Sequence, residues 1–367
     1  MTASRPTVHI AGESRARVFG LSPRERILRQ APRAGVELAG APETADVILS
    51  GAHVYGVSVI AALAGAAPGT LLRDGAGGLA GIRVAGDGAA DAARIAAGSA
   101  APAGALSGAE LAGRYDKVLR KRADPMVRRA GPGDEKAAEQ EIFDATYKGV
   151  TDFVTKHVWP VPALAAVRFC VRAGFSPNQV TLASIVLVFI VFWLFWTGAF
   201  AAGLALAWLM TFLDTVDGKL ARATLTSSRL GDVLDHGVDL IHPPFWWWAW
   251  WVGLGGASAG LGDGGLALGV ILAGYVLQRV MEGVFIARFR IEMHIWRPFD
   301  SFFRSITARR NPNLAILTVA TLLGAPGAGF TLVAIWVFVG LLVHGAQIAQ
   351  GFAAARNGPL TSWLAED

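Results

Sequence analysis

The sequence of 367 residues has one cysteine, few charges and no uninterrupted apolar stretch near its start. Cys170 has no CxxC partner or zinc-ligand spacing around it, which excludes an intramolecular disulfide and a cysteine-based zinc site. Only 17% of the residues are charged, against about 25% in ordinary soluble domains, which excludes a soluble enzyme with one polar shell. The opening MTASRPTVHIAGESRARVFG lacks the apolar core of a signal peptide, so we expect the N-terminus to stay in the cytoplasm.

Apolar residues make up 53% of the chain, and the mean hydropathy is +0.44. Charge is concentrated in the first 160 residues, whereas the chain from Asn178 onward consists of hydrophobic segments. Most are near the roughly 20 residues that cross a bilayer core, and the fifth is short. We expect spans at 178–199, 200–222, 230–255, 265–287, 312–325 and 328–350. The predicted fold class is an α-helical integral membrane protein with six transmembrane helices, preceded by a small α/β cytoplasmic domain.

The arginines flank the predicted spans, so the net charge of +5 and pI of 9.6 do not indicate a nucleic-acid partner. The connections 196–201, 253–265 and 324–328 contain no Lys or Arg, whereas 288–310 holds six arginines. The positive-inside rule therefore places both termini and the loops 223–229 and 288–311 in the cytoplasm, on an inner membrane. Seven tryptophans are expected to form an aromatic belt at the opposite ends: Trp193, Trp196, Trp246, Trp247, Trp248, Trp250 and Trp251.

The composition divides the chain into four predicted parts. Residues 1–112 form an α/β domain, and 113–175 form a basic linker with a juxtamembrane amphipathic helix. That helix lies in the membrane interface, because its apolar run is short and keeps two arginines; a plain linker helix is the alternative. Residues 176–355 form the membrane domain, and 356–367 form a tail.

The front domain alternates short apolar runs with helix-like stretches, which is an α/β pattern. Its opening AGESRARVFGLS, from Ala11 to Ser22, resembles the glycine-rich start of nucleotidyltransferase domains. Glu13 and Arg15 replace two glycines that such a loop needs for close approach to phosphates. The resemblance implies a degenerate, non-catalytic relative with a structural or partner-binding role. Since none of the carboxylates described next lies there, we expect deletion of 1–112 to spare the chemistry.

Carboxylates occur inside two of the apolar segments. Asp214 and Asp217 are three residues apart, and Asp235 and Asp239 are four apart, so each pair shares a helix face. Carboxylates in the membrane are costly and mark a functional site. We expect the four to converge between adjacent antiparallel helices and to bind hard divalent cations, Mg²⁺ or Mn²⁺, as two ions. The alternative is that nearby Arg and Lys satisfy these acids without a metal.

Residues 214–239 read DxxDGxxAR(x8)GxxxDxxxD, and on this signature the chain is identified as a member of the CDP-alcohol phosphotransferase (phosphatidyltransferase) family, covering about 160–355. The resemblance implies transfer of a phosphoryl-alcohol from a CDP-alcohol, such as CDP-diacylglycerol or a CDP-aminoalcohol, to an acceptor hydroxyl. CMP is released, and the product belongs to phospholipid synthesis. The acceptor is a lipid or a soluble alcohol. The resemblance also implies a homodimer in contact with membrane lipids.

The resemblance assigns roles to individual residues. Asp214, Asp217 and Asp235 are implied as metal ligands, with Asp239 as a shared ligand or the general base. The implied nucleotide-binding residues, which include a PNxxT motif before the first span, are Asn178, Thr181, Gly218, Ala221, Arg222 and Gly231.

The base and the substrate remain open at this point. His236, within DHGxD, resembles the choline and ethanolamine phosphotransferase branch and is either a base or a structural histidine. Arg279 either pairs with Glu282 or holds an acceptor phosphate or headgroup, and Lys219 and Arg229 are further candidates for that role. Fusion to a nucleotidyltransferase-like domain instead resembles enzymes of inositol-phosphate lipid or solute synthesis.

Two other classes compete with the transferase. A divalent-cation carrier would need a conduction path with acids near the bilayer midplane, and Arg222 close to the acids opposes cation passage. A nucleotidyltransferase on an inert anchor conflicts with the altered loop at Glu13 and Arg15.

Overall fold

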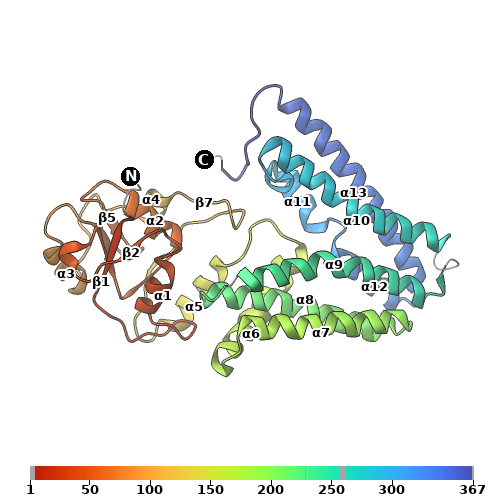
Figure 1. Cartoon of the computed structure of the whole chain (residues 1–367), viewed down its shortest axis with the longest axis horizontal. Coiled ribbons are helices and arrows are strands. Elements are labelled where there is room, and N and C mark those ends of the chain that lie inside the picture. The colour runs from red at the N-terminus through yellow and green to blue at the C-terminus, as the bar shows by residue number, and fades with distance from the viewer. Residues whose placement is uncertain (1–4, 228, 257–261, 366–367) are drawn as a thin grey trace. The chain divides into compact units, whose positions relative to one another are not determined.

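The computed structural model describes residues 5–227, 229–256 and 262–365, with the backbone alone over 229–236 (Figure 1). The chain divides into two compact units, which are described separately. The first contains the chain through Lys117, Arg122–Tyr147 and Ala221–Thr226; the second contains Val118–Lys121, Lys148–Leu220 and the chain from Ser227 onward. Helix α8, Phe200–Ala223, therefore starts in the second unit and ends in the first.

A five-stranded sheet forms the centre of the first unit. Its strands are β1 (Thr7–Ala11), β2 (Glu37–Leu38), β3 (Val47–Ser50), β5 (Leu71–Arg73) and β6 (Leu79–Arg83), in the order β2-β1-β3-β6-β5. Strand β1 runs parallel to β2 and β3, while β6 runs antiparallel to β3 and β5. All four residues of β3 are buried, as expected for a sheet covered on both faces. The prediction of a small α/β region at the front is confirmed.

The helices of the first unit begin at recognisable caps. Helix α1, Pro23–Gln30, starts with a capping box in which Ser22 and Glu25 bond to each other's backbone amides. Asp87 caps α3, Gly88–Ala96, in a similar way. The other elements are η1 (Pro42–Thr44), β4 (His53–Tyr55), α2 (Val57–Gly65), α4 (Gly108–Ala112), β7 (Tyr115–Asp116), β8 (Lys121–Arg122), β9 (Val127–Arg129) and α5 (Glu135–Ala145).

The second unit is helical. It contains η2 (Val154–Val158), α6 (Pro160–Ala173), α7 (Pro177–Trp196), most of α8, α9 (Arg229–Gly253), α10 (Gly264–Phe289), η4 (Met293–Ile295), α11 (Pro298–Ile306), α12 (Arg310–Leu322) and α13 (Pro326–Ala354). Helix α7 packs along α9, and α13 packs against both α10 and α12. Within the described residues, four helices are long and apolar enough to cross a membrane: α7, α8, α10 and α13.

The prediction of six full-length spans is not confirmed. The predicted fifth span, 312–325, corresponds to α12, which has 13 residues. At 1.5 Å per residue such a helix is about 20 Å long, shorter than the roughly 30 Å hydrocarbon core of a bilayer.

The tryptophans do not all form a belt. Trp246, Trp247 and Trp250 on α9 are at most 1% exposed and belong to the core of the second unit. Phe195 of α7 packs edge-on against Trp246 and Trp250, and the Trp246 indole donates to the carbonyl oxygen of Val188 at 3.0 Å. The expectation is wrong for these three residues because α7 covers this face of α9, so their rings bind the two helices together.

Candidate active site

The first half of the acidic signature lies on α8 and is tied to α7. The hydroxyl of Thr181 donates to Asp217 Oδ2 at 2.5 Å, and both side chains are buried. Thr181 occupies this place because the Ser176 capping box and Pro177 start α7 just before it. The PNxxT motif and the signature, which are 36 residues apart in the sequence, therefore meet at one contact.

An arginine forms ion pairs with both halves of the acidic signature. On the sequence alone, this arginine was interpreted only as a topology signal. Arg310, the first residue of α12, donates from Nη2 to Asp214 Oδ2 at 2.6 Å and from Nη1 to Asp239 Oδ1 at 2.5 Å. Asp214 lies on α8 and Asp239 on α9, so one guanidinium spans both helices. Asp214 and Asp239 also interact electrostatically with Asp217. The structure thus brings three of the four predicted acids together.

The other predicted residues fall into three groups. The side chains of Arg229, Gly231, Asp235 and His236 lie outside the described residues, although their backbone continues α9. Lys219 is buried, whereas Asn178 is exposed. Gly218, Ala221 and Arg222 follow Asp217 along the last turns of α8.

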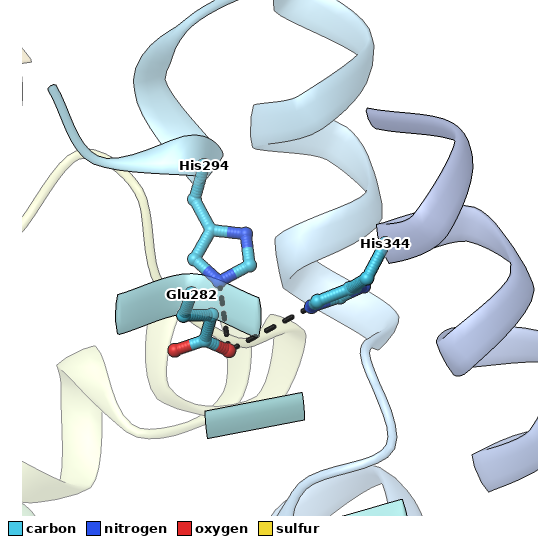
Figure 2. Close-up of side chains that lie close together, drawn as sticks. All are labelled: Glu282, His294 and His344. Carbon is cyan, nitrogen blue, oxygen red and sulfur yellow. Dashed lines mark ion pairs between the residues drawn. The ribbon is translucent and has the colours of Figure 1, made fainter. Parts of the chain in front are cut away.

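Arg279 belongs to a second cluster, centred on Glu282 of α10. Arg309 Nη2 donates to both oxygens of Glu282, at 2.6 and 2.7 Å, whereas Arg279 Nη1 is 3.4 Å from Oε2. His294 Nε2 lies 3.3 Å from Oε1, and His344 Nε2 lies 3.7 Å from the same atom. Figure 2 shows both imidazoles directed at the carboxylate from different elements. The sequence prediction that Arg279 pairs with Glu282 holds, but Arg309 makes the closer contact.

The donor atoms of Glu282, His294 and His344 lie within 4.8 Å of one another, a set that can hold a metal ion. His344 is fully buried, and neither of its ring nitrogens has a hydrogen-bond partner among the residues that the structure describes. However, Arg309 occupies both carboxylate oxygens and lies 3.4 Å from His294 Nε2. A guanidinium in that place opposes a second cation, so we interpret the cluster as the support that orients Arg309.

Cations outnumber acids around this cluster. Arg304 of α11 is close enough to interact electrostatically with two other arginines and two acids. The arginines are Arg309 and Arg279, and the acids are Glu282 and Asp152. The Nε and Nη1 atoms of Arg304 are buried without a hydrogen-bond partner among the described residues. Burial, and then the charge of Arg309, lower the pKa of Arg304 to about 9. Such a group of guanidiniums is suited to an anion with several oxygens, such as phosphate.

His294 remains neutral within the cluster. Burial lowers its pKa to about 3, although Glu282 favours the charged imidazolium. The neutral His294 ring adds no positive charge to the cluster. The charge that attracts an anion therefore comes from Arg279, Arg304 and Arg309.

Sequence reasoning missed Arg309, Arg310, His294 and His344 as site residues. His344 carried the clearest signal, because it is an ionisable residue in a long apolar segment. Arg309 and Arg310 stood among the six arginines of the stretch 288–310. This accumulation of positive charge was interpreted as a topology signal, and the sequence does not reveal the partner of each arginine.

One family model matches the part of the chain that contains the acidic signature. Residues 175–344 match the family model described as CDP-alcohol phosphatidyltransferase. A Rubrobacter xylanophilus protein named bifunctional IPC transferase and DIPP synthase is 32% identical over 197 residues, covering 54% of this chain and 42% of that protein. The chain thus spans less than half the length of this relative.

Among solved structures, the Mycobacterium tuberculosis phosphatidylinositol phosphate synthase PgsA1 with CDP-DAG bound is 19% identical. The match covers 51% of this chain and 92% of that one, with a TM-score of 0.33.

Proposed function

Because residues 175–344 are a CDP-alcohol phosphatidyltransferase domain, we propose that this chain transfers a phosphoryl-alcohol from a CDP-alcohol to an acceptor hydroxyl and releases CMP. The observation that carries the proposal is the acidic group at the α8–α9 junction. Asp214 and Asp239 share one guanidinium, and Asp217 is fixed by Thr181. All three acids belong to the signature, which supports the proposal.

The acids fit a divalent metal. Asp214, Asp217 and Asp239 offer carboxylate oxygens, and the same face of α9 carries Asp235 one turn earlier. Carboxylates in an apolar setting need compensating cations. Arg310 supplies one positive charge to Asp214 and Asp239, which is less than the charge of the four acids, and oxygen ligands suit Mg²⁺ or Mn²⁺ for the remainder. Two bound ions would neutralise the charge that develops on the departing CMP. Arg222, at the end of α8, would bind the pyrophosphate.

Asp239 is the proposed base. Its side chain is 39% exposed, whereas that of Asp214 is 16% exposed, so Asp239 is the more accessible of the two to an acceptor. In the proposed step the acceptor oxygen bonds to the phosphorus that carries the donor alcohol, and the bond from this phosphorus to the bridging oxygen breaks. CMP leaves with that oxygen, and Asp239 takes the hydroxyl proton.

The arginine cluster favours an acceptor that carries its own phosphate. Arg309 faces Glu282, and its neighbour Arg310 faces Asp214 and Asp239. Adjacent residues are about 3.8 Å apart between Cα atoms, so a phosphate held by Arg279, Arg304 and Arg309 would bring a hydroxyl of the same molecule near the acids. This supports an inositol-phosphate type of acceptor over a neutral lipid alcohol with a CDP-aminoalcohol donor.

We propose that α9 and α12 complete a six-segment membrane domain and that α6 lies in the interface. The termini and the acids would face the cytoplasm, because the arginine-rich stretch 288–310 joins α10 to α12. The domain would act as a homodimer. A cation carrier is disfavoured, because residues 175–344 match the CDP-alcohol phosphatidyltransferase family model.

The test is CMP release by the purified chain in lipid nanodiscs. With CDP-diacylglycerol and Mg²⁺, we expect release with an inositol phosphate and much less with inositol or diacylglycerol. Excess EDTA should stop turnover. Release that persists in EDTA would contradict the metal assignment, and equal rates with inositol and inositol phosphate would contradict the acceptor assignment.

A further inference from the structure

Three arginines of the front unit bind the end of the signature helix. Arg26 and Arg29 of α1 donate from Nη1 to the carbonyl oxygens of Ala223 and Thr224, at 2.7 and 2.8 Å. Arg33, just beyond α1, donates from Nη2 to the carbonyl oxygen of Leu225 at 3.1 Å. Segment Ala221–Thr226 is part of the first unit, so these contacts lie within one compact body.

The three acceptors are the carbonyl of Ala223, the last residue of α8, and the carbonyls of the two residues that follow it. The last carbonyls of a helix have no partner within it and carry the negative end of its dipole, so arginines stabilise them. The turn itself is closed: Leu225 has a φ of 57°, and the Thr226 amide donates to the Ala221 carbonyl oxygen at 2.9 Å. The arginines therefore cap an already ordered turn from outside.

Arg26 is bound at some cost. It is 2% exposed, and burial, followed by the charge of Arg29, lowers its pKa to about 10. Burying a cation is costly unless its donors are bonded. The Ala223 carbonyl accepts from Nη1, whereas Nε is buried without a hydrogen-bond partner among the described residues. The hydrogen bond from Arg26 to the last carbonyl of α8 is thus formed by a buried charged residue.

We infer that α1 is a positioning element for the donor site, acting through Arg26, Arg29 and Arg33 on the last turn of α8. Arg222 directly precedes the first capped carbonyl, and Gly218 and Ala221 lie within the preceding turn. Holding Ala223–Leu225 fixes the direction in which Arg222 leaves the helix. The donor part of this inference rests on the proposed function. It reverses the expectation that residues 1–112 are dispensable.

The test uses the full chain in nanodiscs with Arg26→Ala, Arg29→Ala and the double variant. Arg94→Ala is the matched control, because Arg94 lies in the same unit and pairs with Asp91 on the surface. Loss of a charge-assisted hydrogen bond should raise the KM for the CDP-alcohol about tenfold or more. The KM for the acceptor should stay within about twofold, and Arg26→Lys should recover part of the loss because it keeps the cation at the helix end.

Hydrogen exchange of the 222–226 amides gives a readout that does not need turnover. We expect faster exchange there in the Arg26 and Arg29 variants and unchanged exchange in Arg94→Ala. If the wild-type chain shows no CDP-alcohol turnover but exchange still rises, the proposed function fails and the positioning contact stands. Arg29 is exposed, so Arg29→Ala tests the contact without a buried change. Unchanged exchange and unchanged donor KM in that variant and the double variant would overturn the inference.

Discussion

Thr181 and Asp217 lie on different helices and share a buried hydrogen bond of 2.5 Å. The same hydroxyl lies 3.1 Å from the carbonyl oxygen of Pro177 in the preceding turn of α7. Since a hydroxyl has one proton to donate, Asp217 is the charged acceptor that competes for it. Thr181 therefore sets the orientation of one carboxylate of the acidic group.

Replacement of Thr181 by Val should lower CMP release. Valine keeps the shape but leaves Asp217 Oδ2 without its donor, and a hydrogen bond to a charged group is worth about 1.5–3 kcal/mol. We expect a loss of about tenfold or more, with a higher Mg²⁺ requirement. Ser184→Ala is the control, because the buried Ser184 hydroxyl donates to the backbone carbonyl of Thr181 and, among the described side chains, has no hydrogen bond to an acid. Equal losses in both variants would show that packing is responsible.

The choice between Asp239 and His236 as base can be made with two variants. Asp239→Asn should nearly abolish transfer while CDP-alcohol binding largely persists, because an amide cannot take the proton. Weaker donor binding as well would indicate that Asp239 acts chiefly as a metal ligand. His236→Ala should cost less than the roughly 10²-fold typical of a lost general base. The reverse order, measured as single-turnover CMP release, would move the role to His236.

Arg304→Ala should weaken the binding of the acceptor and leave the binding of the donor unchanged. Two buried nitrogens of Arg304 have no protein partner among the described residues, so a bound phosphate is their expected acceptor. We predict a rise of about tenfold or more in the KM for inositol phosphate, since hydrogen bonds between charged groups are the strong ones. The KM for the donor should not change. Arg288→Ala is the control, because Arg288 is exposed and lies over the rings of Phe289 and Phe352; an equal effect there would indicate general surface charge.

The front unit should lose stability in mild acid through His53. Burial lowers the pKa of His53, although its Nε2 lies 3.0 Å from Asp74 Oδ2. The folded state therefore keeps the ring neutral where the unfolded chain, with a pKa of about 6.5, takes a proton. Stability should fall as pH drops below about 6.5, by at most about 1.4 kcal/mol per pH unit, and level off below the folded pKa.

Hydrogen exchange of the β4 amides at pH of about 7.5 and 5.5 measures this effect, since the two values bracket the unfolded pKa. His53→Asn should reduce the difference between the two conditions. His157→Asn, at an exposed position, should leave the difference unchanged. A pH response that is the same in His53→Asn as in the parent would remove His53 as the cause.

The acids could be predicted because each pair lies within one or two turns of a helix, where spacing determines the shared face. Arg310 could not, because it follows Asp239 by 71 residues and reaches it only through the packing of α12. The Glu282 cluster has the same character, with contributions from α10, η4, α12 and α13. The fifth apolar run, 312–325, was already short in the sequence, but its composition does not reveal where helix α12 begins and ends.

Glycines determine how closely α10 and α13 approach. A Cβ on Gly274 would lie 2.2 Å from Val337 Cγ1, one on Gly340 2.8 Å from Gln278 Nε2, and one on Gly351 2.9 Å from Phe285. Glu282 on α10 and His344 on α13 meet inside this contact. The width of the space around the carboxylate is thus set by residues without side chains. A methyl group at one of them would alter the proposed acceptor site while every charged residue remained in place.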